Sequence, residues 1–507
     1  MRKPPAADAA HRLANLSRHA ARLGLCAIVF TLAGCLVGPR YHQPAPVHDQ
    51  MPGSYKESPV HYKNGIGWQV ASPSDAMLRG DWWRVFKDPE LNSLEDQLNI
   101  NNQNIKQSFE NFMESRALVA EAISQLYPTL TADGSALRSA AGTASPMTAI
   151  MTSLNLSWEP DLWGRIRNTV RAAEYNAQVS AADLENERLT EQTALAMIFF
   201  ELRGQDALEK LYSDTIAADK AALEYNQAQY RTGIAGEIAV VQAQNTLENA
   251  QATATNLGVL RAQYEHAIAM LIGKPASSFS LPAKVLESEP PPIPIGLPSQ
   301  LIERRPDISA AERAMAAANA QIGEAYAAYF PAVTLGGEGG FKGTNFPNLF
   351  STQGRFWSVG PSVSEPIFEG GLRPATVHQY VATYNAALAA YRESVLTGFQ
   401  QVEDNLAQVR ILSRQLIQQR AAQKSAQRNL DLEMNRYRTG IDPYLDVTIA
   451  QTTLLTDQQA VITVRIQEMT GAVQLIEALG GGWDRSQLPS AWDVSAPPTA
   501  AETAIQH

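Results

Sequence analysis

The stretch "YRTGIDPYLDVTIAQ", Tyr437 to Gln451, repeats an earlier stretch, "YRTGIAGEIAVVQAQ", Tyr230 to Gln244. Every aligned position differs by 207 in residue number, and both copies begin Tyr-Arg-Thr-Gly-Ile and end Ala-Gln. Asp442 and Asp446 of the second copy stand where the first copy has two alanines. The chain therefore uses one kind of turn twice, and only one of the two turns carries this pair of aspartates.

A long segment free of helix breakers precedes each turn. We expect long helices over 164–231 and 371–438, because their only proline is Pro374, near a helix start where a missing N–H does no harm. At 1.5 Å per residue each helix is about 100 Å long. Return helices are expected over 237–272 and 443–479. The apolar residues recur at three-, four- and seven-residue steps, which is typical of helices packed side by side, and an ordinary coiled coil fits the same pattern.

Other matching sequence segments show that the turns belong to a larger internal duplication. "ISQLYPTLTADG" is echoed by "YAAYFPAVTLGG", and "SWEPDLWGR" by "VSEPIFEGG", at offsets close to that of the turns. We assign the first repeat to 88–280 and the second to 301–480. A linker with six prolines, 281–300, joins them and is expected to be extended. A segment over 35–87 precedes the repeats. A Pro/Ala/Ser-rich tail, 481–507, follows and is expected to be loosely ordered.

The beginning of the chain has the anatomy of a signal peptide. Five basic residues precede the apolar run "LGLCAIVFTLAGC", whose last four residues, Leu32 to Cys35, resemble a bacterial lipobox. We predict a lipoprotein signal peptide over 1–34 and a lipid on Cys35; a plain signal peptide or an anchor helix are the alternatives. Cys26 and Cys35 are the only cysteines, so no disulfide framework or cysteine metal site can be proposed.

Charge and hydropathy exclude two classes of protein. Loss of residues 1–34 would remove five basic residues and one acidic residue and change the formal charge from −10 to −14, which disfavours a nucleic-acid partner. No later stretch approaches 18 consecutive apolar residues, so a helical membrane span is not expected.

Four short segments alternate between apolar and polar residues. They lie at about 128–138, 148–158, 331–343 and 355–367, and each has the length of a tilted transmembrane strand. Four strands cannot close a barrel in lipid, so a dimer with eight strands or a trimer with twelve would be required; soluble hairpins are the alternative. Aromatic residues stand at the strand ends, as in an interfacial belt: Tyr127, Trp158, Trp163, Tyr329, Phe330, Phe356 and Phe368.

Taken together, these motifs resemble the TolC family of outer-membrane efflux proteins, in its OprM-like lipoprotein branch. The resemblance covers nearly the whole mature chain and depends on the order of the motifs. They are the lipobox with "CLVGPRYHQP", "DWWRVFKDPELNSL", "SWEPDLWGRIR", the two "YRTGI" turns, "LIERRPDISAAE" and "ALGGGW". The basic N-terminal region is longer than is usual in the family.

The resemblance implies a homotrimer. Its four strands per protomer would form a twelve-stranded β-barrel in the outer membrane, continuous with a periplasmic α-helical barrel. The hairpin tips would lie at the periplasmic mouth, where a periplasmic adaptor protein docks and an inner-membrane pump of the RND type delivers substrate. Lipid on Cys35 would be a secondary tether to the outer membrane, and Leu36 is not the aspartate that marks inner-membrane retention.

The resemblance also places acidic aperture residues at the second turn. Asp446, one per protomer, would form a ring of three carboxylates that favours cations, while a solvated helix face and a helix-dipole role for Asp442 are the simpler readings. Arg231 and Arg438 would tie neighbouring helices or cap their own carbonyls. The candidate site residues are Asp442, Tyr444 and Asp446 at the aperture, and Arg231, Thr232, Gly233, Arg438, Thr439 and Gly440 at the tips.

Catalytic chemistry is not expected. "GGEGGFKGT", Gly336 to Thr344, lacks the spacing of a phosphate-binding loop, so its glycines are predicted to allow close approach of strands. The histidines show no metal-ligand spacing and no nucleophile has a partner, so neither a metal nor another cofactor is predicted. The leading function is a passive exit duct for drugs or small molecules. The alternatives are a duct for type I secretion or metal efflux, and a structural coiled-coil envelope lipoprotein.

Overall fold

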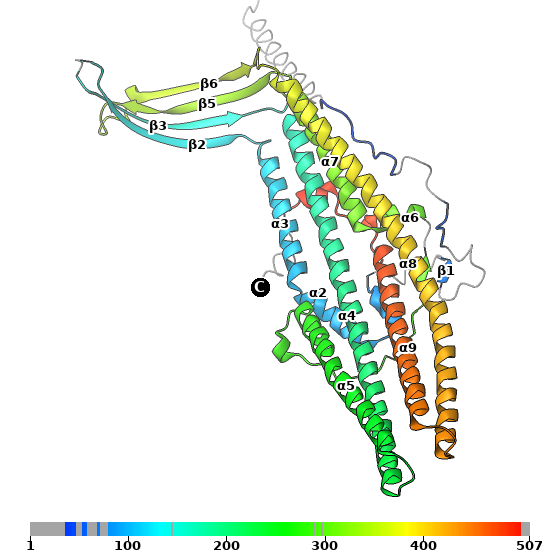
Figure 1. Ribbon diagram of the computed structural model, residues 1–507. Coiled ribbons are helices and arrows are strands. Elements are labelled where there is room, and N and C mark those ends of the chain that lie inside the picture. Colours follow the sequence, from blue (N-terminus) through cyan, green and yellow to red (C-terminus); the bar gives the residue numbers. More distant parts are fainter. Residues whose placement is uncertain are drawn as a thin grey trace, which may run out of the picture.

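The computed structural model describes residues 36–46, 53–57, 68–70, 80–142, 145–286, 289–291, 293–295 and 298–497. A four-stranded sheet lies at one end of the molecule, and two helical hairpins run from it toward the opposite end, where both turn (Figure 1). Each half of the chain contributes two shorter helices, two strands of this sheet, a long helix and a return helix, in the same order.

Apart from α2 and α6, which have 13 and 7 residues, the principal elements have nearly matching lengths in the two halves. The first half contains α2 (Pro89–Asn101), α3 (Gln103–Ser124), β2 (Thr129–Ser139), β3 (Met147–Trp158), α4 (Arg165–Arg231) and α5 (Glu237–Leu271). The second contains α6 (Pro298–Arg304), α7 (Pro306–Ala327), β5 (Ala332–Gly343), β6 (Arg355–Ser364), α8 (Leu372–Arg438) and α9 (Tyr444–Ala478). Helices α4 and α8 each have 67 residues, and α5 and α9 each have 35.

The short elements lie between and after these. Strands β1 (Trp68–Val70) and β4 (Ile293–Ile295) pair in parallel. Four 3₁₀ turns cover Trp82–Phe86, Ala276–Ser278, Thr352–Gly354 and Arg485–Gln487, and α10 spans Ala491–Ser495. Within the described part of the chain, no helix is both long enough and apolar enough to cross a bilayer.

The observed boundaries differ from the predicted ones for local reasons. Helices α4 and α8 begin one residue later than predicted, because Gly164 and Gly371 are left-handed, with φ of 81° and 90°. Strand β6 ends at Ser364 instead of 367, just before the Glu-Pro pair that follows. Pro366 cannot donate a ladder hydrogen bond, and the next residue, Ile367, is 93% exposed.

The linker, predicted to be extended, and the tail, predicted to be loosely ordered, both contain helical residues that were not predicted from the sequence. The proline-rich linker includes β4, and α6 begins inside it at Pro298, where proline suits the first helical turn. Within its described residues the tail contains a 3₁₀ turn and α10, and side chains of the helices bind its backbone. Arg116 donates to the Ala496 carbonyl at 2.7 Å, and Gln178 donates to the Pro489 carbonyl at 2.9 Å.

The sheet is antiparallel throughout, in the order β2-β3-β5-β6. Directly paired residues point to the same face, and the register places most apolar side chains on one face. These are Leu130, Ala132, Ala136, Ile150, Leu154, Leu156, Trp158, Val333, Leu335, Phe341, Trp357, Val359, Pro361 and Val363. The other face carries mainly polar residues such as Thr131, Asp133, Asn155, Glu338 and Ser358. Leu130, Trp357 and Val359 are 66, 79 and 75% exposed, so the chain leaves much of its apolar face uncovered.

The glycine-rich segment is strand β5, as predicted. A β-carbon at Gly340 would lie 2.1 Å from the Thr152 carbonyl oxygen of β3, which is far inside van der Waals contact. Glycine is therefore required there for the two backbones to approach each other.

The first described residues run from the sheet end of the helices along α7. Val37 N–H donates to the Trp163 carbonyl at 3.2 Å, Asn319 donates to the Pro39 carbonyl at 3.2 Å, and the Tyr41 hydroxyl donates to Glu312. This N-terminal segment therefore begins beside the start of α4, just beyond the sheet.

The largest apolar core lies between the sheet and the tips. Trp82, Trp83, Phe199 and Phe200 are fully buried in it, with residues from α2, α5, α7, α8 and α9 around them. A smaller cluster lies near the tips and contains Ala239, Ala243, Tyr437, Tyr444 and Val447. The two hairpins are therefore also packed together near their ends.

Candidate functional site at the two hairpin tips

Both hairpins turn in the same way. Gly233 and Gly440 each have φ of 75°, a conformation that glycine adopts without the cost a β-carbon brings. In the first tip, Ile234 N–H donates to the Gln229 carbonyl at 2.9 Å, and the second tip has the equivalent bond, also at 2.9 Å. This is the bonding of a Schellman cap, so both glycines are left-handed helix caps.

The other shared residues of the tips have separate roles. The Thr232 hydroxyl donates to the Ala228 carbonyl at 3.1 Å, and the Thr439 hydroxyl donates to the equivalent carbonyl at 3.0 Å. The threonines therefore bond carbonyls of the last helical turn. Arg231 and Arg438 are exposed, and across the described residues neither side chain makes an ion pair or caps a carbonyl. Within one chain, they play neither of the two roles considered from the sequence.

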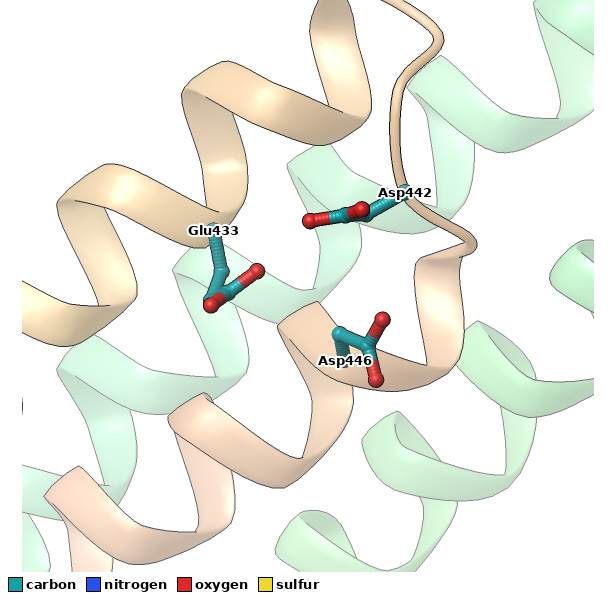
Figure 2. A group of neighbouring side chains, drawn as sticks. All are labelled: Glu433, Asp442 and Asp446. Atoms are coloured by element: carbon teal, nitrogen blue, oxygen red, sulfur yellow. The ribbon is translucent and has the colours of Figure 1, made fainter.

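Three carboxylates come together at the second tip. Glu433 extends from the last turns of α8, Asp442 from the turn and Asp446 from the first turn of α9 (Figure 2). One oxygen from each lies within 4.8 Å of the others. Three negative charges this close repel one another unless a cation lies among them.

Arg436 supplies a positive charge to this group. Its guanidinium binds both oxygens of Asp442, through Nε to Oδ2 and through Nη2 to Oδ1 at 2.9 Å. The hydrogen bond and charge of Arg436 hold the pKa of Asp442 below its ordinary value. Asp442 therefore forms an ion pair inside its own hairpin, in place of the simple helix-dipole role considered from the sequence. The carboxylate spacing would also suit a metal ion, but we retain the absence of a metal as a prediction.

Sequence reasoning missed Glu433 and Arg436. The aligned positions of the first tip are Asn226 and Gln229, which are neutral, as are the alanines opposite Asp442 and Asp446. The difference between the tips thus includes four positions that are charged in the second tip and neutral in the first, while Glu237 of the first tip stands opposite Tyr444 of the second. The alignment of the two copies could have identified these residues, because the offset of 207 also holds in the helical turn before the shared Tyr-Arg-Thr-Gly-Ile.

Two tyrosines of the second hairpin join it to the first. The Tyr437 hydroxyl donates to Asn226 Oδ1 and lies 3.3 Å from Gln229 Oε1. Tyr444 packs against Tyr437 with ring centroids 5.3 Å apart and is only 4% exposed. Burial, with the nearby Asp219, raises the pKa of Tyr444 to about 12. Tyr444, predicted at the aperture, therefore lies inside the joint between the hairpins.

The predicted lipidation residue, Cys35, lies outside the described residues, as does the signal peptide over 1–34. The next residue, Leu36, packs close to Gly164, where a β-carbon would lie 2.6 Å from Leu36 Cδ1. The chain following Cys35 is therefore held next to the sheet.

Comparison with known proteins agrees with this architecture. The family model described as "Outer membrane efflux protein" matches residues 94–274 and 297–481. The antibiotic efflux pump outer membrane protein ArpC and the toluene efflux pump outer membrane protein TtgC, both of Pseudomonas putida, are each 30% identical over 472 residues, or 91% of this chain and 95% of the relative. The solved outer-membrane channel OprN superposes with a TM-score of 0.79 at 27% identity, covering 89% of this chain and all of OprN. This chain belongs to the outer membrane efflux protein family, whose members are efflux ducts and not enzymes.

Proposed function

We propose that three copies of this chain form the passive exit duct of a tripartite efflux system. The observation that carries the proposal is the apolar, largely uncovered face of the sheet, at the end of the molecule opposite the hairpin tips (Figure 1). An apolar face suits lipid, and the polar face of the same strands suits an aqueous lumen.

The sheet edges support the oligomeric state. Among the described residues, strands β2 and β6 each have one partner, so each leaves one edge unpaired there. Unpaired backbone groups are costly in lipid, and closure between copies satisfies them. Three copies give a twelve-stranded barrel continuous with the helices, and the 67-residue helices α4 and α8 extend about 100 Å into the periplasm.

The second tips would form the aperture. In a trimer, three copies of the group Glu433, Asp442 and Asp446 meet at the periplasmic mouth, each with an Arg436. A surplus of carboxylates there favours cations. The joint made by Tyr437 and Tyr444 holds each second hairpin against the first, so opening requires that joint to loosen. The exposed residues of both tips, including Arg231 and Arg438, would form the docking surface for a periplasmic adaptor.

Lipid on Cys35 would tether each copy to the outer membrane. The close packing of Leu36 against Gly164, just before α4, supports this, because Leu36 is the residue that follows Cys35 in the sequence. A lipid chain at that level reaches the bilayer without a long linker.

The cargo would be small organic molecules, as the names of ArpC and TtgC indicate for those proteins. An inner-membrane pump of the RND type would deliver them. Type I secretion and metal efflux remain alternatives for the same duct, and a structural envelope lipoprotein is the alternative of another class.

Planar-bilayer recording tests the proposal. The purified full-length protein should give stepwise cation-selective currents, and Asp446→Ala should alter their selectivity. Asp214→Ala, an exposed aspartate of α4 paired with Lys210, is the control. A protein that assembles but produces no channel would instead support the structural alternative.

A further inference from the structure

Asp219 is a buried carboxylate that the proposed aperture does not use. It lies on α4, twelve residues before the helix ends at Arg231, and is 4% exposed. The aligned position in α8 is Ala426, which is also buried. The second half of the chain thus shows that an apolar side chain can occupy this helical position, and the first half has an acid there.

One carboxylate oxygen of Asp219 has no hydrogen-bond donor. Oδ2 is buried and makes no hydrogen bond to any described residue, and the same holds for Oε1 of Gln451 on α9. An acceptor buried without a donor costs about 1–3 kcal/mol. Both oxygens only accept hydrogen bonds, so no bond can form between these two atoms unless the Asp219 carboxylate gains a proton.

The register of α4 and α9 places these residues at the same level. Gln459 of α9 donates to the Tyr212 hydroxyl of α4, and the two helices run in opposite directions (Figure 1). Asp219 follows Tyr212 by seven residues on α4. Position 452 precedes Gln459 by seven residues on α9 and is adjacent to Gln451. Asp219 and Gln451 are therefore within one residue of the same level along two packed helices.

The groups around Asp219 provide little to stabilise a negative charge. From α9, Tyr444 is close enough for Asp219 to raise its pKa, and Tyr437 of α8 lies against Tyr444. Both are uncharged phenols near neutral pH. Burial raises the pKa of Asp219 to about 6, and in the part of the chain that the structure describes no cation opposes that rise.

We propose that Asp219 is a proton-dependent latch between the two hairpins of each protomer. When protonated, Asp219 becomes a hydrogen-bond donor at the α4–α9 interface and keeps the second hairpin packed on the first. When ionised, it is a buried anion beside Tyr444, and parting of the hairpins lets water reach it. The inference rests on the proposed function in one respect, because packing of the hairpins closes the duct.

The direction of the pH effect follows from the raised pKa. The free carboxyl titrates near 3.8 and the buried one near 6. Below pH 3.8 Asp219 is protonated in both states, so the packed state bears no free-energy cost from a buried charge. Between pH 3.8 and about 6 that cost grows, and above pH 6 it is fully present. Acid should close the tips, and neutral pH should favour opening by up to about a hundredfold, less where water already reaches the carboxyl.

A thiol reporter measures packing without requiring a channel. Val447 is fully buried in the joint and Ile234 is 74% exposed at the first tip. The rate of maleimide labelling is measured for Val447→Cys and for Ile234→Cys at the same pH. Dividing the first rate by the second corrects for the change of thiol reactivity with pH. The full-length protein without a reporter gives the background. The ratio should be several-fold lower at pH 5 than at pH 8.

Two variants decide the role of Asp219. Asp219→Asn keeps the shape and supplies a donor at every pH, so the ratio should stay low at pH 8. Asp219→Ala, which copies Ala426, should also abolish the pH dependence. Asp214→Asn, an exposed acid of the same helix, should leave it intact. A pH response that persists in both Asp219 variants, or is absent from the parent protein, would overturn the latch. Absence of currents with an intact labelling response would instead reject the exit-duct proposal.

Discussion

The hydroxyl of Tyr437 on α8 donates a hydrogen bond to Oδ1 of Asn226 on α4, between residues 211 positions apart. Asn226 is fully buried, and its amide nitrogen donates to the Ala222 carbonyl of its own helix at 2.8 Å. A residue of the second tip is thereby bonded to the neutral counterpart of Glu433 in the first tip. The joint between the hairpins therefore contains a hydrogen bond between two defined side chains as well as apolar contacts.

Tyr437→Phe should loosen this joint. The change keeps the ring contacts and removes one donor, which costs about 1 kcal/mol or about a fivefold increase in the open population. Single-channel open probability measures the effect. The matched control is Tyr230→Phe, the aligned and half-exposed tyrosine of the first tip, which should behave like the parent. Equal opening in both variants would show that the hydrogen bond does not hold the joint.

Arg436→Gln should increase the preference of the duct for cations. The group of three carboxylates and one guanidinium then changes from a formal charge of −2 to −3. The pKa of Asp442 is lowered by Arg436, so the ion pair stabilises the tip above the ordinary carboxyl pKa and is lost only as pH falls through the lowered value. The reversal potential, measured in a salt gradient at pH 7, should shift toward the equilibrium potential of the cation. Arg428→Gln, an exposed arginine of α8, is the control.

Gly440→Ala should destabilise the second tip. A β-carbon there would meet no atom within 4 Å, so the effect comes from the backbone alone. A residue with a β-carbon at φ of 75° costs about 1–2 kcal/mol. Limited proteolysis should cut the tip several times faster. Gly236→Ala, at φ of −76°, should be tolerated, and similar cleavage of both variants would contradict the backbone explanation.

Val359→Arg should prevent assembly in the outer membrane. Val359 lies on the apolar face of β6, and an arginine facing lipid costs about 2–4 kcal/mol near the bilayer midplane. Ser358→Arg places the same charge on the polar face of the same strand and should assemble. The amount of trimer in outer-membrane fractions compares them. If both variants assemble equally well, the apolar face does not contact lipid.

Cys35→Ser should remove the lipid and leave trimers intact. The N-terminal segment is held by bonds such as Val37 to Trp163, and the strands supply their own membrane contact. Intact-mass spectrometry should show loss of the acyl groups, while gel mobility in mild detergent should still show trimers. Trimers that disappear with the lipid would mean that the tether is needed for assembly.

The local elements could be read from the sequence. The long helices were placed to within one residue, because an uninterrupted run and a following glycine are properties of neighbouring residues. The same is true of β5, where alternation and glycines lie within one segment. The error at β6 was also local, since the Glu-Pro pair after Ser364 was visible. The ordered tail was missed because its order comes from Arg116 and Gln178, which are distant in sequence.

The sequence by itself determined that one turn is used twice, that only one copy carries the two aspartates Asp442 and Asp446, and that long helices flank both. Only the tertiary structure decided that Arg436 pairs with Asp442, that Tyr444 is buried, and that Asp219 faces the second hairpin. The physical reason is the range of the interactions. Helix periodicity and glycine caps depend on residues a few positions apart. The burial and pairing of side chains depend on how two hairpins, about 200 residues apart in sequence, pack against each other.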